Sequence, residues 1–306
     1  MMGRSWILLD CKLCGSTDVS IVYNDVVRNG GIGKYTENEV AVWKCNECEI
    51  IWHEPLVNIN SYYESKEYRE SLENTSEEEA FYKLHDQESM EKLQYVGTEK
   101  FRGKIVADIG CGCGAFLDYV NSVATDVVAI EPSEAYRKIM NRKGFHVYPY
   151  ASDAIADYEG KLNLITSFDV IEHVNDPLDF LKEIYQLLDI GGSAFIGTPT
   201  NAPIMRSLMG QEYEKKLLYS VQHLWIFSEK NLSMISGKIG FKKCSFKYYQ
   251  RYGLSNLLAW LKERKPMGHI QYDFVTAGMD AVYKAEVERM GLSDYIVMYL
   301  SKDDLK

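Results

Sequence analysis

The chain has 306 residues, which is more than one average domain and suits one α/β domain with a small second unit. Its composition is that of a globular protein, and no apolar run approaches the ~18 residues of a membrane-spanning helix. The opening residues lack a signal-peptide pattern, so we expect a cytoplasmic protein with no membrane span.

The net charge of −10 is unevenly spread along the chain. Residues 1–60 carry 5 basic and 8 acidic groups, and residues 61–100 carry 5 and 11. Nucleic acid is therefore disfavoured as a partner, because its phosphates would meet a net negative surface. The range 230–270 is the exception, with nine basic residues against one acid. This range, which includes Lys247 and Arg251, suits either a phosphate-bearing acceptor or a solvated face of the fold.

Residues 1–56 form the first predicted unit, a small metal-stabilised module. It contains two Cys-x-x-Cys pairs, whose members are Cys11, Cys14, Cys45 and Cys48. Four thiolates suit tetrahedral Zn²⁺, and a unit of this size has too small a core to be stable without such a crosslink. We predict structural zinc, with a redox pair as the alternative.

Residues 57–100 form the second predicted unit, an acidic and helical connector or lid. Thr75 or Ser76 is a suitable helix cap, because three glutamates follow directly and favour the positive end of a helix dipole.

Residues 101–306 form the third predicted unit, in which short apolar runs alternate with helical stretches. This alternation indicates βαβ units and a mostly parallel sheet. Ser133 begins a predicted helix that ends at Gly144, and Asp176 with Pro177 begins another that ends at Gly191. The predicted strands are 104–109, 126–130, 145–148, 162–168, 193–198, 241–249 and 295–300. The expected fold is a doubly wound, Rossmann-like, seven-stranded α/β domain.

A glycine loop follows the first of these strands, in the run VADIGCGCG. Its glycines, at 110, 112 and 114, allow a ligand to approach the backbone at the carboxyl end of a parallel strand. Taken alone, such a loop could hold NAD, FAD or another adenosyl ligand. Glu131 ends the next strand, where an acid can bind both ribose hydroxyls. Asp108 favours a ligand with an ammonium and a sulfonium, because a carboxylate there would repel the pyrophosphate of a dinucleotide.

With these residues, the chain resembles the class I S-adenosylmethionine-dependent methyltransferases. The resemblance rests on VADIGCGCG, AIEPS, SFDVIEHVNDP and LLDIGGSAFIGTP, in this order between residues 104 and 199. One departure is Leu162-Asn163, where the family often has Phe-Asp. The resemblance implies that S-adenosylmethionine is the cofactor. It assigns the methionine end to Asp108, Gly110, Gly112 and Gly114, the ribose to Glu131, the adenine amino group to Asp153, and the border of the site to Phe168.

The cysteine module followed by this domain resembles a bacterial subgroup found in sugar and cell-surface polysaccharide pathways. It implies methyl transfer to a small-molecule or glycan acceptor, with a hydroxyl of a sugar or nucleotide-linked intermediate as the expected target. The alternatives are a C- or N-methyltransferase of a similar acceptor, or an RNA methyltransferase that uses the zinc ribbon.

His173 and His223 are the candidate catalytic residues, because methylation of a hydroxyl is helped by a general base. His173 stands in IEHV, just past the fourth strand, and His223 stands in QHLWIF, before a helix that Ser228 caps. A structural role remains open for each: His173 could orient its loop, and His223 could be a buried, hydrogen-bonded residue.

Overall fold

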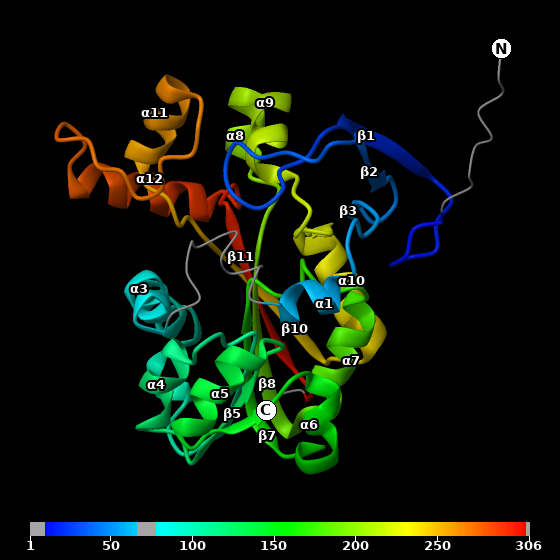
Figure 1. Cartoon of the computed structure of the whole chain (residues 1–306), viewed down its shortest axis with the longest axis vertical. Coiled ribbons are helices and arrows are strands. Elements are labelled where there is room, and N and C mark those ends of the chain that lie inside the picture. Colours follow the sequence, from blue (N-terminus) through cyan, green and yellow to red (C-terminus); the bar gives the residue numbers. More distant parts are fainter. Residues whose placement is uncertain (1–9, 66–77, 304–306) are drawn as a thin grey trace.

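The structure is a computed structural model that describes residues 10–65 and 78–303. Two sheets, of seven and four strands, organise this part of the chain (Figure 1). The predicted helix cap at Thr75 or Ser76 lies outside the described residues. The connector helix that it was expected to begin is α3 (Glu78–Val96).

The seven-stranded sheet has the order β10-β11-β8-β7-β4-β5-β6. Its strands pair in parallel from β6 to β8, whereas β11 runs antiparallel between β8 and β10. This arrangement confirms the predicted Rossmann-like class. The strands are β4 (Ile105–Ile109), β5 (Asp126–Ile130), β6 (His146–Tyr148), β7 (Leu162–Phe168), β8 (Leu188–Pro199), β10 (Lys243–Tyr249) and β11 (Tyr295–Ser301).

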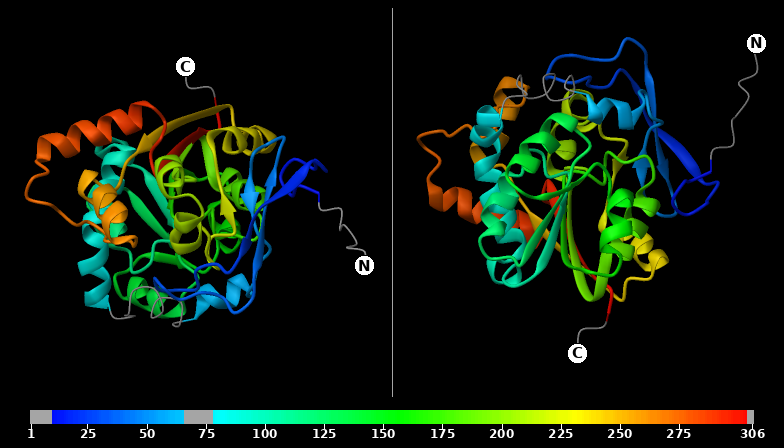
Figure 2. Two further views of the ribbon diagram at one scale, coloured as in Figure 1. Left: turned by 90° about the horizontal axis from the view of Figure 1, so that it is seen from above. Right: turned by 60° about the horizontal axis from the view of Figure 1, so that its bottom comes forward.

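Both faces of this sheet are buried, and neighbouring residues of each strand face opposite sides. Val106 and Val127 join one apolar cluster, and Ala107 and Val128 join the other. Burial on both faces explains why the central strands β4 and β5 consist mostly of apolar residues. Six helices cover the two faces: α3, α4 (Ala115–Asn121) and α5 (Glu134–Arg142) on one, and α6 (Ala151–Tyr158), α7 (Pro177–Leu187) and α10 (Glu229–Ile239) on the other (Figure 2).

The predicted end of α7 at Gly191 is wrong, because the helix ends at Leu187 and β8 begins at Leu188. Leu188 already pairs with Leu162 of β7. Gly192 serves close strand packing instead of ending a helix, since a Cβ on it would lie 2.9 Å from the carbonyl oxygen of Leu162. Strand pairing, a long-range interaction, therefore overrides the local glycine signal.

The four-stranded sheet joins distant parts of the sequence, in the order β1-β2-β3-β9. Three strands come from the cysteine-rich module, namely β1 (Val19–Asp25), β2 (Val40–Cys45) and β3 (Ile51–Trp52). The fourth, β9 (Trp225–Ile226), comes from the large domain and pairs with β3. The predicted boundary at residue 56 remains a prediction, but the module and the domain share this sheet.

Most of the remaining helices lie beyond the end of the large sheet where β8 finishes (Figure 1), whereas the 3₁₀ turn at Thr98–Lys100 precedes β4. They include a π-helical turn, η2, at Glu214–Leu218. Within the described ranges, none of the helices combines the length and the apolar character that a membrane crossing requires. The others are α1 (Ile59–Glu64), the 3₁₀ turn η1 (Thr98–Lys100), α8 (Pro203–Met209), α9 (Gln211–Tyr213), α11 (Leu254–Glu263) and α12 (Ala277–Arg289).

We expect Gly192→Ala to lower the free energy of unfolding by about 1–3 kcal/mol, because the added carbon meets backbone that cannot move away. Gly191→Ala is the matched control, since no atom lies within 4 Å of a Cβ there. It should change stability by less than about 0.5 kcal/mol. Urea unfolding of both variants measures the difference in their free energies of unfolding. Equal losses of stability in the two variants would contradict the close strand packing that distinguishes Gly192 from Gly191 in β8.

Candidate active site

The glycine loop connects β4 to α4 and has little room for side chains. Gly110 has a φ of +80°, and a Cβ on it would overlap Val170. Gly112 has a φ of +56°, and its Cβ would overlap the ring of Phe81 from α3. Glycine is required at both positions, because other residues rarely adopt this backbone and would clash. Helix α3 therefore lies against the predicted cofactor loop, and its role as a lid remains a prediction.

Asp108 lies near the carboxyl end of β4 and is buried. Its Oδ1 accepts a hydrogen bond of 2.7 Å from the hydroxyl of Thr166. Burial raises the pKa of Asp108 to about 6, against the opposing effect of Lys92 on α3 and the Thr166 hydrogen bond. The free protein thus holds a carboxyl group whose ionisation a nearby positive charge would favour.

Glu131 ties the glycine loop to the loop after β5. Its two carboxylate oxygens accept hydrogen bonds of 2.9 Å from the backbone amides of Gly112 and Ser133. A carboxylate oxygen accepts more than one hydrogen bond, so a role of Glu131 toward ribose hydroxyls is compatible with these two contacts. The residue lines a cavity of about 490 Å³, which we call the first cavity.

The first cavity lies at the carboxyl ends of β4, β5 and β7. Gly110 and Glu131 form part of its wall, and α1 contributes Tyr63. Five residues of the predicted cofactor set do not line it, namely Asp108, Gly112, Gly114, Asp153 and Phe168. Asp153 lies in the first turn of α6, where its carboxylate accepts the amide hydrogen of Tyr150. Phe168 is buried, with the Lys92 ammonium 5.6 Å from its ring centre. Their cofactor contacts remain predictions.

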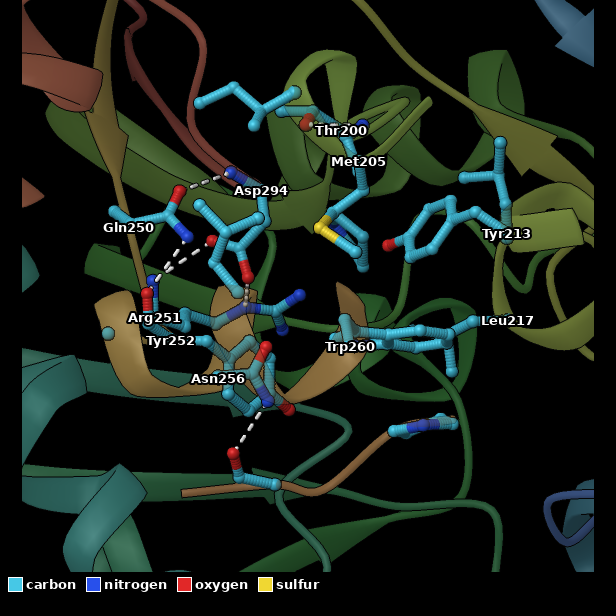
Figure 3. A pocket seen from close by; sticks show the side chains of 18 of the residues that line it. Thr200, Met205, Tyr213, Leu217, Gln250, Arg251, Tyr252, Asn256, Trp260 and Asp294 are labelled. Atoms are coloured by element: carbon cyan, nitrogen blue, oxygen red, sulfur yellow. Dashed lines mark hydrogen bonds and ion pairs between the residues drawn. The ribbon is translucent and has the colours of Figure 1, made fainter. Parts of the chain in front are cut away.

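A second cavity, of about 410 Å³, adjoins the first (Figure 3). Asp169 lines both cavities and occupies the left-handed backbone region with a φ of +57°. A non-glycine residue rarely adopts this conformation, and such residues cluster at functional sites. The Tyr295 hydroxyl donates to Asp169 at 3.2 Å.

Arg251 forms one wall of the second cavity, and its charge is balanced there. Its guanidinium lies 3.5 Å from a carboxylate oxygen of Asp169 and 3.5 Å from one of Asp294. Figure 3 shows Arg251 and Asp294 beside Gln250, whose side-chain oxygen accepts the amide hydrogen of Asp294. Lys247, by contrast, is exposed on β10 with its ammonium 4.7 Å from the ring centre of Tyr249. The two basic residues therefore lie in different surroundings.

The two predicted catalytic histidines lie together at the boundary of the cavities. His173 lines the first cavity and His223 lines the second, and their ring centres are 4.9 Å apart. Nδ1 of His173 lies 2.7 Å from the carbonyl oxygen of Gln222 and 2.8 Å from the Tyr63 hydroxyl. Burial and the nearby His173 lower the pKa of His223 well below its ordinary value, so this ring is neutral near pH 7.

The cysteine-rich module holds His223 in place through the backbone. The amide of Arg28 donates to the carbonyl of Tyr219, and the amide of Val221 donates to the carbonyl of Arg28. Nε2 of His53 lies 2.9 Å from the carbonyl oxygen of Ser220. Arg28 also lines the second cavity, so this module forms part of its wall.

The four predicted metal ligands converge in this module. The sulfur atoms of Cys11 and Cys48 are 3.6 Å apart, and those of Cys14 and Cys45 are 3.5 Å apart. All four ligand atoms lie within 4.8 Å of one another, and none of the cysteines is in a disulfide. Sulfurs bound to one tetrahedral zinc at about 2.3 Å lie about 3.8 Å apart, so this set fits zinc.

Sequence reasoning did not single out Asp169 or the aromatic wall of the second cavity. Asp169 follows a buried strand directly in SFDVIEHV, and this position at the ligand edge was an available signal. The aromatic residues of the wall had no such signal, because they come from segments far apart in sequence. They are Tyr213, Tyr252, Trp260 and Tyr283.

Comparison with known proteins identifies a family to which the chain is matched and solved structures that have a similar fold. Residues 78–245, more than half of the chain, match a family model described as a methyltransferase domain. The chain is 30% identical over 142 residues to a ubiquinone biosynthesis O-methyltransferase of Xanthomonas euvesicatoria, covering 43% of this chain. It spans 59% of the length of that relative.

Two solved structures share the fold. One is a SAM-dependent methyltransferase of Thermotoga maritima, described as a possible histamine N-methyltransferase, at 21% identity and a TM-score of 0.50, covering 74% of this chain and 94% of the other. The second is phosphoethanolamine N-methyltransferase 2 of Haemonchus contortus with S-adenosyl-L-methionine, at 16% identity and a TM-score of 0.51, covering 83% and 62%.

We expect S-adenosylmethionine to bind more tightly as pH rises through about 6, because Asp108 then ionises beside a positively charged ligand. Asp108→Asn should lose this dependence and bind about 10-fold more weakly at pH 8. Calorimetric titration between pH 5 and 8 measures both effects. Asp118→Asn, at an exposed position of α4, is the control and should keep the wild-type profile. Equal wild-type affinity at pH 5 and 8 would refute the role of Asp108.

Cys45→Ser should remove one equivalent of zinc per chain and lower the free energy of unfolding by about 3 kcal/mol or more, because the metal crosslinks a small core. Elemental analysis and urea unfolding provide the two readings. Cys244→Ser is the matched control, since Cys244 is partly buried on β10 and outside the cluster. A Cys45→Ser chain that keeps its full zinc content would exclude the four-cysteine site.

Proposed function

The chain belongs to the methyltransferase-domain family, and from that premise we propose that it transfers a methyl group from S-adenosylmethionine to a hydroxyl group of a small molecule. The observation that carries this proposal is the pair of adjoining cavities, which share Asp169 and meet at the two histidines. A donor in the first cavity and an acceptor in the second would face each other across this boundary.

The first cavity suits the cofactor by its shape and its carboxyl groups. When bound, S-adenosylmethionine supplies a methyl group on a positively charged sulfonium. Gly110 would let the methionine end approach the loop backbone, and Asp108 would offer its buried carboxyl group to the ammonium group. Glu131 is positioned to accept hydrogen bonds from the ribose, and Asp153 is assigned to the adenine end. The closely packed backbone then excludes water from the donor.

The second cavity suits a ring-shaped acceptor that carries polar groups. Its volume lies in the range of small-molecule sites, and aromatic rings form much of its wall. Tyr213 and Trp260 lie edge to face, with ring centres 5.3 Å apart. Arg28 and Arg251 add guanidinium groups. We assign the acceptor to sugars or nucleotide-linked intermediates, because these combine a ring that can pack on aromatic walls with several hydroxyl groups.

Oxygen is the proposed acceptor atom for two reasons. The histidine pair lies where an acceptor hydroxyl would meet the donor, and a hydroxyl must lose its proton when it is methylated. The ubiquinone biosynthesis relative is an O-methyltransferase by name, and it is 30% identical to the chain over 142 residues. His173 and His223 would therefore act on the acceptor hydroxyl, while the cavity walls hold it in line with the methyl group.

The experiment follows tritium from methyl-labelled S-adenosylmethionine into a panel of sugars, nucleotide sugars and related amines. We expect label in hydroxyl-bearing acceptors. His223→Ala should lower turnover at least about 100-fold while the affinity for S-adenosylmethionine stays unchanged, because this histidine faces the acceptor.

The control is His146→Ala, which changes an exposed histidine of β6. It should leave turnover and cofactor affinity unchanged. Label found in amines alone would overturn the choice of oxygen, and unchanged turnover in His223→Ala would remove this residue from the mechanism.

A further inference from the structure

Three potential metal ligands lie at the boundary between the two cavities, apart from the cysteine module. Glu172, His173 and His223 each offer one ligand atom, and these atoms lie within 4.8 Å of one another. Nε2 of His173 is 3.8 Å from Oε1 of Glu172, which is too long for a hydrogen bond. Two ligands bound at about 2.1 Å to one cation lie about 3 to 4 Å apart, so this spacing admits a cation between them.

The orientation of His173 matches that of a metal ligand. A carbonyl oxygen only accepts hydrogen bonds, so the 2.7 Å contact with Gln222 requires the hydrogen on Nδ1. Nε2 of the neutral ring then carries its lone pair, and this atom is the one near Glu172. Metal-binding histidines usually hold their other nitrogen to a backbone carbonyl in this way.

Glu172 provides an independent observation. The residue is 1% exposed, and its Oε2 accepts a hydrogen bond of 2.9 Å from the Thr198 hydroxyl. Its Oε1 is buried and has no hydrogen-bond partner. A buried polar atom without a partner costs free energy, and a cation at this position would supply the missing interaction. The orphaned oxygen belongs to the carboxylate that lies beside Nε2 of His173.

Hydrogen bonds to the surrounding backbone fix the positions of the two segments that carry these three residues. The amide of Trp225 donates to the carbonyl of Glu172, and its indole nitrogen donates to the carbonyl of Val174. The amide of His223 donates to the hydroxyl of Ser220. Both segments are thus fixed before any ligand arrives, as a metal site requires.

We propose that Glu172, His173 and His223 form a divalent-cation site, of the two-histidine, one-carboxylate type, between the two cavities. Imidazole and carboxylate ligands suit zinc or another first-row transition metal better than magnesium or calcium. Three protein ligands leave at least one coordination position open. Since His173 and His223 line opposite cavities, that position is accessible to the acceptor.

The role of this site rests on the proposed function and narrows its substrate class. A bound cation lowers the pKa of a hydroxyl that it contacts, so the proton leaves to solvent through the second cavity. The deprotonated oxygen then forms its bond to the methyl carbon, and the carbon–sulfur bond breaks with its electron pair on sulfur. More than one open position would favour acceptors with two adjacent oxygen atoms, such as vicinal diols.

The test titrates Co²⁺ into the full chain after weakly bound metal has been removed and one zinc per chain has been retained. We expect one further equivalent to bind, with visible d–d absorption and no thiolate charge-transfer band. Glu172→Gln keeps the size of the side chain, and it should weaken this binding about 100-fold or more, because losing even an outer partner costs 10- to 100-fold. His146→Ala is the matched histidine control and should bind as the wild type does.

The outcomes separate this inference from the proposed function, because cobalt binding is read without turnover. Co²⁺ should also raise the thermal unfolding midpoint of the wild type and not that of Glu172→Gln. Because each protein is compared with itself, this reading holds even if the substitution alters the stability of the fold. Absence of a second equivalent, or equal binding by Glu172→Gln, overturns the inference even if methyl transfer is found. Binding with no methyl transfer to any hydroxyl would leave the site standing and defeat the proposed function instead.

Discussion

The reversal of strand order beside β4 is the constraint on which the candidate site depends. The chain places β5 and β6 on one side of β4 and β7 and β8 on the other, so the loops at their carboxyl ends diverge. The glycine loop, the turn at Glu131 and the segment 169–175 consequently surround one opening. Glu131 fixes its width, because one carboxylate accepts amide hydrogens from two of these loops. Without these two hydrogen bonds, the glycine loop and the turn after β5 would not be joined to each other at this point.

The cysteine module also helps to position residues around this opening. Its strand β3 pairs with β9, and its residues hold the segment 219–221 through backbone hydrogen bonds. His223 follows this segment directly, and Trp225 of β9 binds the loop that carries Glu172. The large domain and α1 thus form the first cavity, whereas the histidine boundary and the second cavity also need the cysteine module. Backbone pairing thereby connects the four-cysteine module to a site that contains none of its cysteines.

Local sequence predicts the large sheet and its glycine loop well and the second cavity poorly, for a physical reason. The glycine loop, Asp108 and Glu131 lie within one βαβ unit, where short-range pattern and loop chemistry decide the structure. All seven strands of the large sheet were predicted from the same kind of pattern. The end of α7 was wrong, because the pairing of Leu188 with Leu162 is a tertiary interaction. Asp169 and Arg251 are 82 residues apart, and no local signal indicates their ion pair.

The two-residue strand β9 has a consequence for exchanging parts between related proteins. Because β9 completes a sheet that the first unit begins, a graft of the large domain alone would leave β9 without its partner β3 and the second cavity without Arg28. On the proposed function, acceptor preference would depend on both units, because they share the second cavity's wall and the β3–β9 pairing. A chimera designed to transfer this preference to another protein must therefore contain the cysteine module, the 219–226 segment and the cavity wall together.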